Sequence, residues 1–291
     1  MQSEVDGVAG AAPRDDPSVD DHAFGFIDST FFQHGSLEAL EAGETDAPKR
    51  VQLREDEPGL DADIFGPSMP KMFGAEDEQL YMHEVEGKNL IIPLEKYGVK
   101  MLSLGFLVDK EKAILWRGAM ASNALRQLIN EADWGELDYF VIDLPPGTSD
   151  IHLTLVQTLP ITGAIVVTTP QQVALADARK GISMFMGEHV GVPVLGIVEN
   201  MSWFTPASHP DEKYFIFGHD GGKQLAETLG VELLGQIPLV ASICKGSDDG
   251  QPVVRVNDVS GAAFKQLATR VMDAIDRRNQ SLPPTEVVQT H

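Results

Sequence analysis

The chain is poor in positive charge. Its 291 residues hold 22 lysines and arginines against 44 aspartates and glutamates, which gives a formal net charge of -22. Binding the phosphates of a nucleic acid or of an anionic lipid surface needs surplus Lys and Arg. This balance excludes a general electrostatic affinity for DNA, RNA or membranes, and it leaves only a local basic site open.

Cysteine and long apolar runs are also scarce. A single cysteine, Cys244, excludes an intramolecular disulfide framework. The sequence contains neither a signal-peptide pattern nor an apolar stretch of transmembrane length. We therefore expect a cytoplasmic protein that contacts no membrane and no nucleic acid.

A third feature is missing, the phosphate loop Gly-x-x-x-x-Gly-Lys-Ser/Thr. In that motif the backbone amides and the lysine hold phosphates, and the hydroxyl group binds magnesium. The nearest fragments are Gly87-Lys88-Asn89 and Gly221-Gly222-Lys223-Gln224, and both lack the hydroxyl residue after the lysine. The chain as written therefore offers no such cradle for a triphosphate.

Composition divides the chain into three parts. Residues 1–59 carry 14 acidic and 4 basic residues, with short apolar islands such as Phe24-Gly25-Phe26-Ile27. Because so polar a segment cannot offset the entropy lost on ordering, we predict that it is largely disordered. Residues 60–279 form one predicted domain, and residues 280–291, which include Pro283-Pro284, are predicted to be a flexible tail.

Short apolar runs alternate with amphipathic segments from Leu60 onward. This alternation predicts an α/β fold with a mostly parallel sheet and helices on both faces. The predicted strands are 99–104, 140–143, 164–169, 194–199 and 233–237, and the predicted helices are 119–132, 149–158, 175–189, 222–229 and 261–277. The apolar stripe of the last helix favours core packing over a membrane or partner contact.

Two segments place carboxylates at strand ends. Asp61 and Asp63 are two residues apart, so in an extended chain they point to the same side, where one could orient a water molecule. Alone, an acidic loop is the simpler interpretation. The apolar run 139–142 ends in Asp143 before Pro145-Pro146-Gly147, the position where nucleotide-binding α/β folds hold magnesium. A stiff turn under that carboxylate favours function over a plain structural turn.

Two later segments could bind a base. The strand 194–199 is followed by Asn200, whose amide could pair with a purine edge, although strand-ending asparagines usually make turns. Pro238 follows the strand 233–237 and could shape the same pocket. Each signal is weak alone.

Together, these segments resemble the Mrp/ApbC family of iron-sulfur cluster carriers, deviant-Walker P-loop ATPases related to MinD and ParA. The resemblance runs from about Leu60 to Arg278. It rests on Asp61-Ala62-Asp63-Ile64-Phe65-Gly66-Pro67-Ser68, Trp116-Arg117-Gly118, Asp143-Leu144-Pro145-Pro146-Gly147-Thr148-Ser149-Asp150, Thr168-Thr169-Pro170-Gln171, Glu199-Asn200-Met201-Ser202 and Ile216-Phe217-Gly218.

The resemblance implies roles for single residues. Asp63 would position the hydrolytic water, and Asp143 would hold magnesium through water. Asp61 and Gly147 would lie at the nucleotide, Asn200 would contact adenine, and Pro238 would border the base. The implied cofactors are ATP and magnesium, and the implied partners are a second copy of the chain and iron-sulfur apoproteins or assembly proteins.

The sequence departs from the family at two sites. The expected strand, phosphate loop and helix before Asp61 are absent, and Gly35 to Gly59 are acidic instead. Pro206 and His209 stand where many members have the Cys-x-x-Cys pair whose thiolates hold the cluster. We identify no iron-sulfur ligand: His209 is interpreted as a solvated loop residue and Cys244 as a small apolar one.

The sequence therefore predicts an ATP-dependent iron-sulfur cluster carrier or assembly protein that is impaired in nucleotide and cluster binding as written. Two alternatives stay open. A catalytically silent dimerisation partner would keep the fold without the loop. A MinD- or ParA-like positioning ATPase would share the carboxylates, but it should carry a basic helix or surface, which this sequence does not display.

Overall fold

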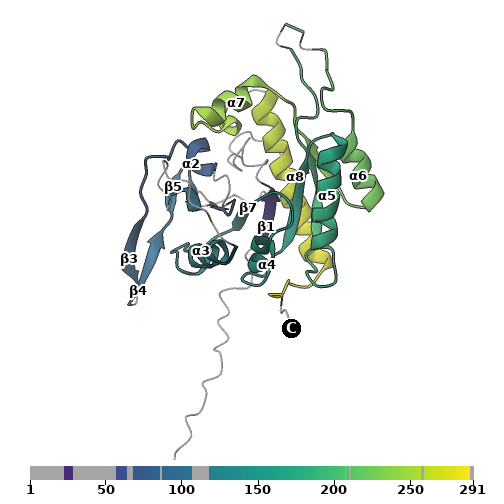
Figure 1. Ribbon diagram of the computed structural model, residues 1–291. Helices are drawn as coiled ribbons and strands as arrows, with labels where there is room; N and C mark the ends of the chain where they lie inside the picture. Colours follow the sequence, from purple (N-terminus) through teal and green to yellow (C-terminus); the bar gives the residue numbers. More distant parts are fainter. Residues whose placement is uncertain are drawn as a thin grey trace, which may run out of the picture.

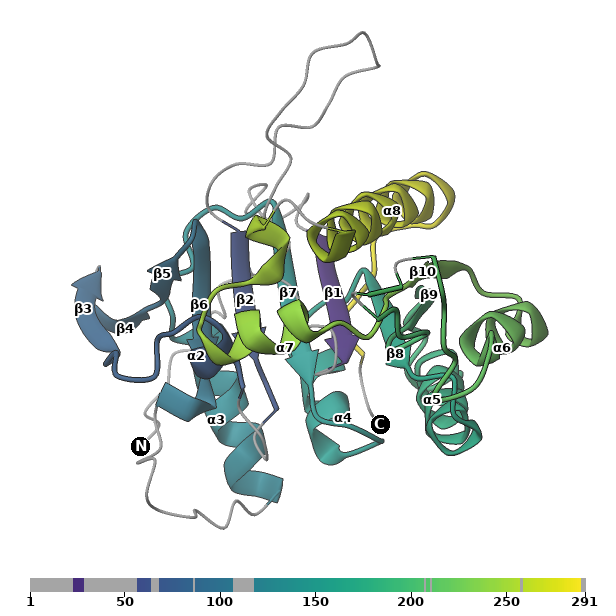
Figure 2. The ribbon, with the colours of Figure 1, turned by 90° about the horizontal axis from the view of Figure 1, so that it is seen from above.

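The computed structural model describes residues 23–28, 57–63, 68–85, 87–106, 118–206, 208–209, 211–256 and 259–288. Its centre is a twisted sheet between two layers of helices (Figures 1 and 2). This arrangement confirms the predicted α/β class.

Eight strands form the central sheet in the order β10-β9-β8-β1-β7-β2-β6-β5. They are β1 (Ala23–Asp28), β2 (Glu57–Asp61), β5 (Leu94–Lys96), β6 (Val99–Ser103), β7 (Tyr139–Leu144), β8 (Gly163–Thr168), β9 (Val194–Glu199) and β10 (Leu233–Gln236). All neighbouring pairs are parallel except β5 with β6. A separate antiparallel hairpin joins β3 (Tyr81–Val85) to β4 (Lys88–Ile92).

Seven α-helices are described: α2 (Met69–Met72), α3 (Gly118–Asn130), α4 (Asp150–Val156), α5 (Gln172–Phe185), α6 (Gly221–Leu229), α7 (Ala241–Asp248) and α8 (Val259–Ser281). Helices α3, α4 and α5 lie on one side of the sheet and α8 on the other (Figure 2). Two short 3-10 turns, η1 (Leu104–Phe106) and η2 (Val253–Arg255), complete the described elements.

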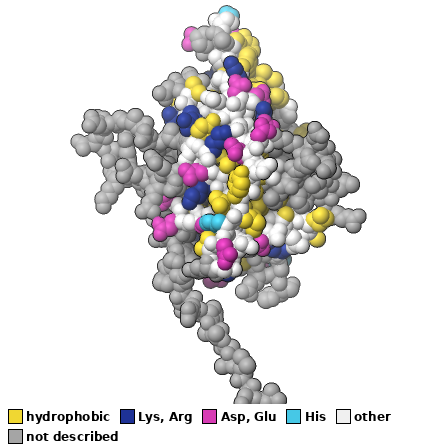
Figure 3. Space-filling view, turned by 90° about the vertical axis from the view of Figure 1, so that its left-hand side faces the viewer, with side chains coloured by type: hydrophobic (Ala, Val, Ile, Leu, Met, Phe, Trp, Pro, Cys, Tyr) yellow, Lys and Arg dark blue, Asp and Glu magenta, His cyan; other side chains and the backbone are white. Residues whose placement is uncertain are grey.

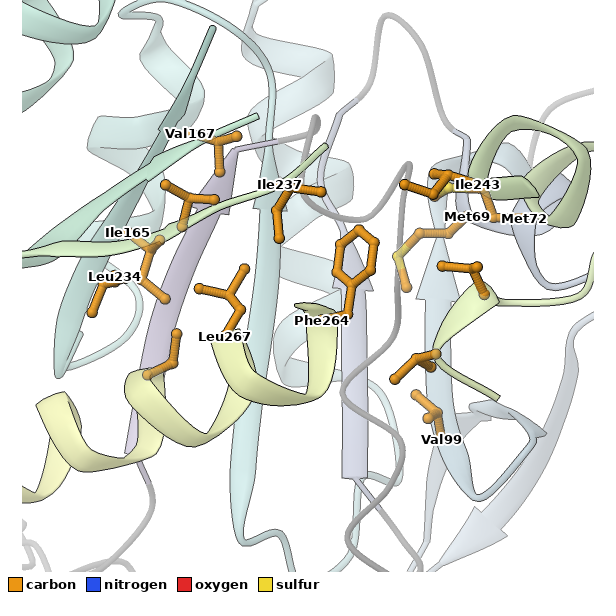
Figure 4. Packing of buried hydrophobic residues seen from close by; sticks show 14 of the residues in the cluster. Met69, Met72, Val99, Ile165, Val167, Leu234, Ile237, Ile243, Phe264 and Leu267 are labelled. Carbon is orange, nitrogen blue, oxygen red and sulfur yellow. The ribbon is translucent and has the colours of Figure 1, made fainter. Parts of the chain in front are cut away.

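Alternation along β8 shows how one strand supports both layers. Ile165 and Val167 pack with α8, whereas Ala164 packs with α4 and Val166 with α5. Figure 4 shows Phe264 and Leu267 of α8 against Ile237 and Leu234. The apolar stripe of α8 is therefore core, as its spacing predicts.

The positions of the five predicted strands and five predicted helices are confirmed, with ends that differ by a few residues. The sheet nevertheless begins before residue 60, and this corrects the predicted absence of an N-terminal strand. Strand β1 lies between β7 and β8, and β2 starts at Glu57. A short apolar segment can form a strand when both of its edges are paired with other strands. The average composition of residues 1–59 does not reveal such a segment. The other residues of 1–56 lie outside the described part of the chain.

The segment after α8 contacts the rest of the fold. The N–H of Val288 donates to the carbonyl of Val156 at 2.9 Å, and Arg278 donates to the carbonyl of Pro283 at 2.7 Å. These contacts place residues 282–288 beside α4 (Figure 1). Flexibility of this tail stays a prediction.

The side of the molecule with the β3-β4 hairpin carries scattered apolar side chains among charges of both signs (Figure 3). Tyr81 and Met82 on β3 and Ile92 on β4 are exposed there. Within the part of the chain that the structure describes, no helix is long and apolar enough to cross a membrane.

Candidate functional site

Strand connections diverge at the centre of the sheet. The chain leaves β1 toward β2 on one side, whereas it leaves β8 toward β9 on the other. In open parallel sheets, ligands bind beyond the carboxyl ends of the strands at such a switch point. The predicted site residues lie at or just beyond the carboxyl ends of β2, β7, β9 and β10, so all of them belong to this edge.

Asp61 and Asp143 lie side by side at this edge. Their Cα atoms are in register in the parallel pair β2-β7, and the N–H of Ala62 donates to the carbonyl of Asp143 at 2.9 Å. In-register side chains of neighbouring parallel strands point to the same face, about 5 Å apart. Both residues are fully buried. The structure thus places two carboxylates together from segments 82 positions apart in the sequence.

Asp61 is tied to the surrounding backbone. Its carboxylate accepts hydrogen bonds from the Ser103 hydroxyl at 2.8 Å, from the Asp63 N–H at 3.2 Å and from the Met69 N–H at 3.3 Å. Burial nevertheless raises the pKa of Asp61 from 3.8 to about 7. Asp61 therefore organises the entrance to α2, a role that the sequence analysis did not assign.

Asp63 lies just beyond the end of β2 and is buried. Its N–H donates to the Asp61 carboxylate, so the backbone forms a turn here and does not continue as a strand. Asp61, Asp63 and Asp143 form one acidic group. Ser103, at the end of β6, contacts this group through its hydrogen bond to Asp61. The sequence analysis missed it, although a hydroxyl residue at a strand end is a signal of the same kind as Asn200.

The turn after β7 is open at Gly147. Its φ is +83°, a conformation that favours glycine, and an added Cβ would meet no atom within 4 Å. The following helix α4 begins after Ser149, whose N–H donates to Nδ1 of His152 at 3.2 Å. This reciprocal cap holds the turn in place.

His152 is a buried histidine that the sequence analysis did not select. Burial lowers its pKa from 6.5 to about 4. Its ring centroid lies 6.1 Å from that of Phe185 on α5. A neutral ring that accepts the Ser149 N–H on Nδ1 carries its proton on Nε2.

A cavity of about 400 Å³ adjoins this turn. Its lining includes Leu144 to Gly147, His152, Thr168, Thr169 and part of α5. Pockets of 300–1,000 Å³ are typical of small-molecule sites. Of the predicted site residues, Gly147 lines this cavity, whereas the three aspartates, Asn200 and Pro238 are not part of its described lining.

Asn200 and Pro238 lie on segments that the structure brings together. The N–H of Ile237 donates to the carbonyl of Glu199, and the N–H of Ser202 donates to that of Ile237, both at 2.9 Å. The Asn200 side chain closes its own turn, because its Oδ1 accepts the Met201 N–H at 2.8 Å. Its amide N–H groups keep their donor capacity toward a purine.

Glu199 links the end of β9 to α6 and β10. Its carboxylate is fully buried and accepts the Gly222 N–H at the start of α6 and the Gln236 amide of β10, the latter at 2.8 Å. Gly222 suits this contact, since an added Cβ would lie 3.0 Å from Cβ of Glu199. A charged residue that ends an apolar strand could have revealed this link, because buried charges need partners.

The loop between β9 and α6 is a hairpin whose base pairs Phe204 with Tyr214. Pro206 and His209 share one turn, because the His209 N–H donates to the Pro206 carbonyl at 3.0 Å. The His209 ring is exposed, as predicted, and its Nδ1 lies 3.8 Å from Glu212. Neither position supplies a thiolate.

Cys244 is exposed on α7, which corrects its interpretation as a small apolar core residue. The charge of Asp248 and a hydrogen bond from Sγ to its carboxylate raise the pKa of the Cys244 thiol. Cluster iron binds the thiolate, so this environment disfavours ligation. Among the described residues, no group of three or more His, Cys, Asp and Glu side chains is arranged to hold a metal ion.

These features define an α/β protein of the P-loop NTPase-like type, with buried carboxylates and a polar strand end at one switch point. The chain belongs to the ParA family described as NUBPL iron-transfer P-loop NTPase, whose profile matches residues 54–272.

Named relatives agree with this assignment. The iron-sulfur cluster carrier protein of Haemophilus influenzae is 49% identical over 227 residues, 77% of this chain and 60% of the relative. That of Synechocystis sp. is 44% identical over 208 residues, 72% of this chain and 58% of the relative. The chain thus spans about three fifths of the length of these relatives.

A solved structure is also similar. A nucleotide-binding protein of Archaeoglobus fulgidus, in complex with ADP, is 34% identical and has a TM-score of 0.56. The match covers 67% of this chain and 74% of that protein. This likeness confirms the predicted P-loop NTPase-like fold.

Proposed function

We propose that the chain acts in the cytoplasm in iron-sulfur cluster assembly or transfer, on a nucleotide-type scaffold whose phosphate-binding half is missing from the sequence as written. One observation carries the proposal: Asp61 and Asp143 are buried in register at the ends of β2 and β7. A fold keeps a pair of buried carboxylates at a cost, which a bound cation offsets. Relatives named as cluster carriers support the same role.

The residues take the following parts in this proposal. Asp143 would hold magnesium through water, and Asp63 would position the water for attack on the terminal phosphate. Gly147 leaves room for the phosphates, since an added Cβ there meets open space. Asn200 donates an amide N–H to adenine, and Pro238 borders the base. A nucleotide that touches both groups lies across the ends of β1 and β8.

Magnesium fits this arrangement on the carboxylate side. The ion usually keeps several waters and takes one or two carboxylates together with substrate phosphates, so three protein ligands are not needed. When bound, it would supply positive charge that neutralises the phosphate oxygens. The phosphate side does not fit, because no Gly-x-x-x-x-Gly-Lys-Ser/Thr occurs in the sequence.

The cluster is cargo in this role, and we expect that the chain does not hold it through its own side chains. After anaerobic reconstitution with iron and sulfide, absorption and iron analysis should show no stable [4Fe-4S] cluster, because the single thiol is poorly ionised. Cys244→Ser should leave the spectrum unchanged. A stoichiometric cluster that disappears in Cys244→Ser would make Cys244 a ligand and refute this expectation.

A second candidate is a silent dimerisation partner, which stabilises a cluster-carrying copy without hydrolysing ATP. It is favoured by the hairpin, which has Pro206 and His209 in place of thiols and exposes Tyr214, Phe215 and Ile216. Mixing the chain with the Haemophilus influenzae relative separates the candidates. A silent partner forms a mixed dimer of measurable mass in solution, whereas an impaired carrier of the leading kind forms homodimers with itself and meets iron-sulfur proteins as recipients.

A further inference from the structure

A second cavity, of about 270 Å³, lies at the opposite edge of the sheet from the carboxylates. Its wall includes Ile161, two residues before β8, and Pro193, directly before β9. The segment after α8 closes it, with Pro283 and Val288 among the lining residues. At roughly 30 Å³ per water molecule, it has room for about nine waters.

One buried cation borders this cavity. Arg278 of α8 is 8% exposed. Its Nη1 donates to Oδ1 of Asn279 at 3.2 Å, and its Nη2 donates to the Pro283 carbonyl at 2.7 Å. Both acceptors are neutral. In the described part of the chain, the buried Nε has no hydrogen-bond partner.

A guanidinium group stays charged in proteins, so Arg278 is a buried positive charge that forms no ion pair with any carboxylate that the structure describes. Burial also lowers the pKa of Arg278. A buried charge of this kind is normally paired. The missing component is an anion beside the Arg278 guanidinium, which belongs to the lining of the cavity.

The remaining lining residues indicate the chemical character of the rest of the ligand. Val156, Leu159, Val190 and Val192 make it apolar, and the only acidic residue in the lining is Glu286, which is exposed. An inorganic anion would leave this wall uncovered. A short apolar chain with one carboxylate covers the wall and pairs with Arg278.

We propose that this cavity binds a small organic carboxylate, with its carboxyl group on Arg278 and its apolar body against the ends of α4 and β9. The site is separate from the nucleotide edge, so its occupant need not compete with ATP. Because the same guanidinium holds the Pro283 carbonyl, binding also steadies the segment 282–288.

The test is calorimetric titration of the full chain with hexanoate, hexan-1-ol and inorganic phosphate at matched ionic strength. A charge-assisted hydrogen bond is roughly twice as strong as a neutral one, so hexanoate should bind about tenfold more tightly than either control. Equal binding of hexan-1-ol, tighter binding of phosphate, or no binding of hexanoate would overturn the proposal.

Matched variants locate the site. Arg278→Gln should weaken hexanoate at least about tenfold, since it removes the cation. Arg277→Gln is the control, because Arg277 is the neighbouring residue, is exposed and pairs with Glu232 outside the cavity. Leu159→Trp fills the cavity and keeps Arg278, so it should also abolish hexanoate binding. It provides the test if Arg278→Gln does not fold. Hexanoate binding that survives in both Arg278→Gln and Leu159→Trp would contradict the assignment.

Discussion

Replacing Asp61 by asparagine should make the folded protein progressively more stable, relative to the parent, as the pH rises from about 4 to about 7. The parent carboxyl has a pKa of about 7 in the fold against 3.8 in the unfolded chain. Its stabilising contribution is therefore complete below pH 3.8 and is lost as pH rises through 7. Integrated over that window, the change reaches about 4 kcal/mol.

Burial of Asp61 sets the sign of this effect. Desolvation is the largest cause, and the Asp63 charge raises the pKa further, whereas the bonds from Ser103, Met69 and Asp63 lower it. Asp143 lies in register beside it. Denaturant unfolding at several pH values, with EDTA present, measures the difference between variant and parent. A constant offset across pH 4 to 7 would contradict the burial argument.

His152 should show the opposite slope in the same experiment. Its folded pKa is about 4 against 6.5, so its contribution is present above pH 6.5 and is lost as pH falls toward 4. His152→Gln keeps an acceptor for the Ser149 N–H, since Gln is a usual capping-box residue at this helix position. We expect the free energy of unfolding of His152→Gln to exceed that of the parent by up to about 3 kcal/mol near pH 4 and to equal it above pH 7.

Grafting a phosphate loop should restore nucleotide binding. We expect that replacing residues 1–56 by the strand, loop and helix of the Haemophilus influenzae relative raises the affinity for magnesium-ATP at least about a hundredfold, or 2.7 kcal/mol. The incoming strand finds β7 and β8 on both sides, as β1 does now. Hydrolysis should return with binding.

Two substitutions in the graft test the assigned carboxylates. Asp143→Asn should weaken magnesium-dependent binding and hydrolysis together, whereas Asp63→Asn should mainly lower kcat, because orienting water matters most in the transition state. Asp133→Asn is a control, since this half-exposed carboxylate pairs with His83 of β3 and is not one of the assigned site residues. A graft that hydrolyses ATP equally well with both substitutions would show that the catalytic residues lie elsewhere.

Sequence patterns predicted much of this fold for a physical reason. Buried parallel strands such as β8 and β9 are continuous apolar runs, and α8 has a clear stripe. Strand β1 was missed because its pairing partners are more than a hundred residues away. The short strands β3 to β5 follow local pairing that periodicity does not mark.

The candidate site was predicted in part. Motifs marked Asp61, Asp63, Asp143 and Asn200, but no motif marked Ser103 or His152, whose roles depend on neighbours brought together by the fold. Likewise, a charged residue at the end of an apolar strand indicates that Glu199 needs a partner, but the fold is needed to identify Gly222, 23 residues away, as that partner.

Calorimetric titration of the unaltered chain with magnesium-ATP, beside the Haemophilus influenzae relative, tests the central claim most directly. The claim is that the carboxylate half of the site is present and the phosphate cradle is not. We expect the chain to bind at least about a hundredfold more weakly than the relative. Equal, micromolar affinity in the two proteins would contradict the claim and would require another loop of this chain to bind the phosphates.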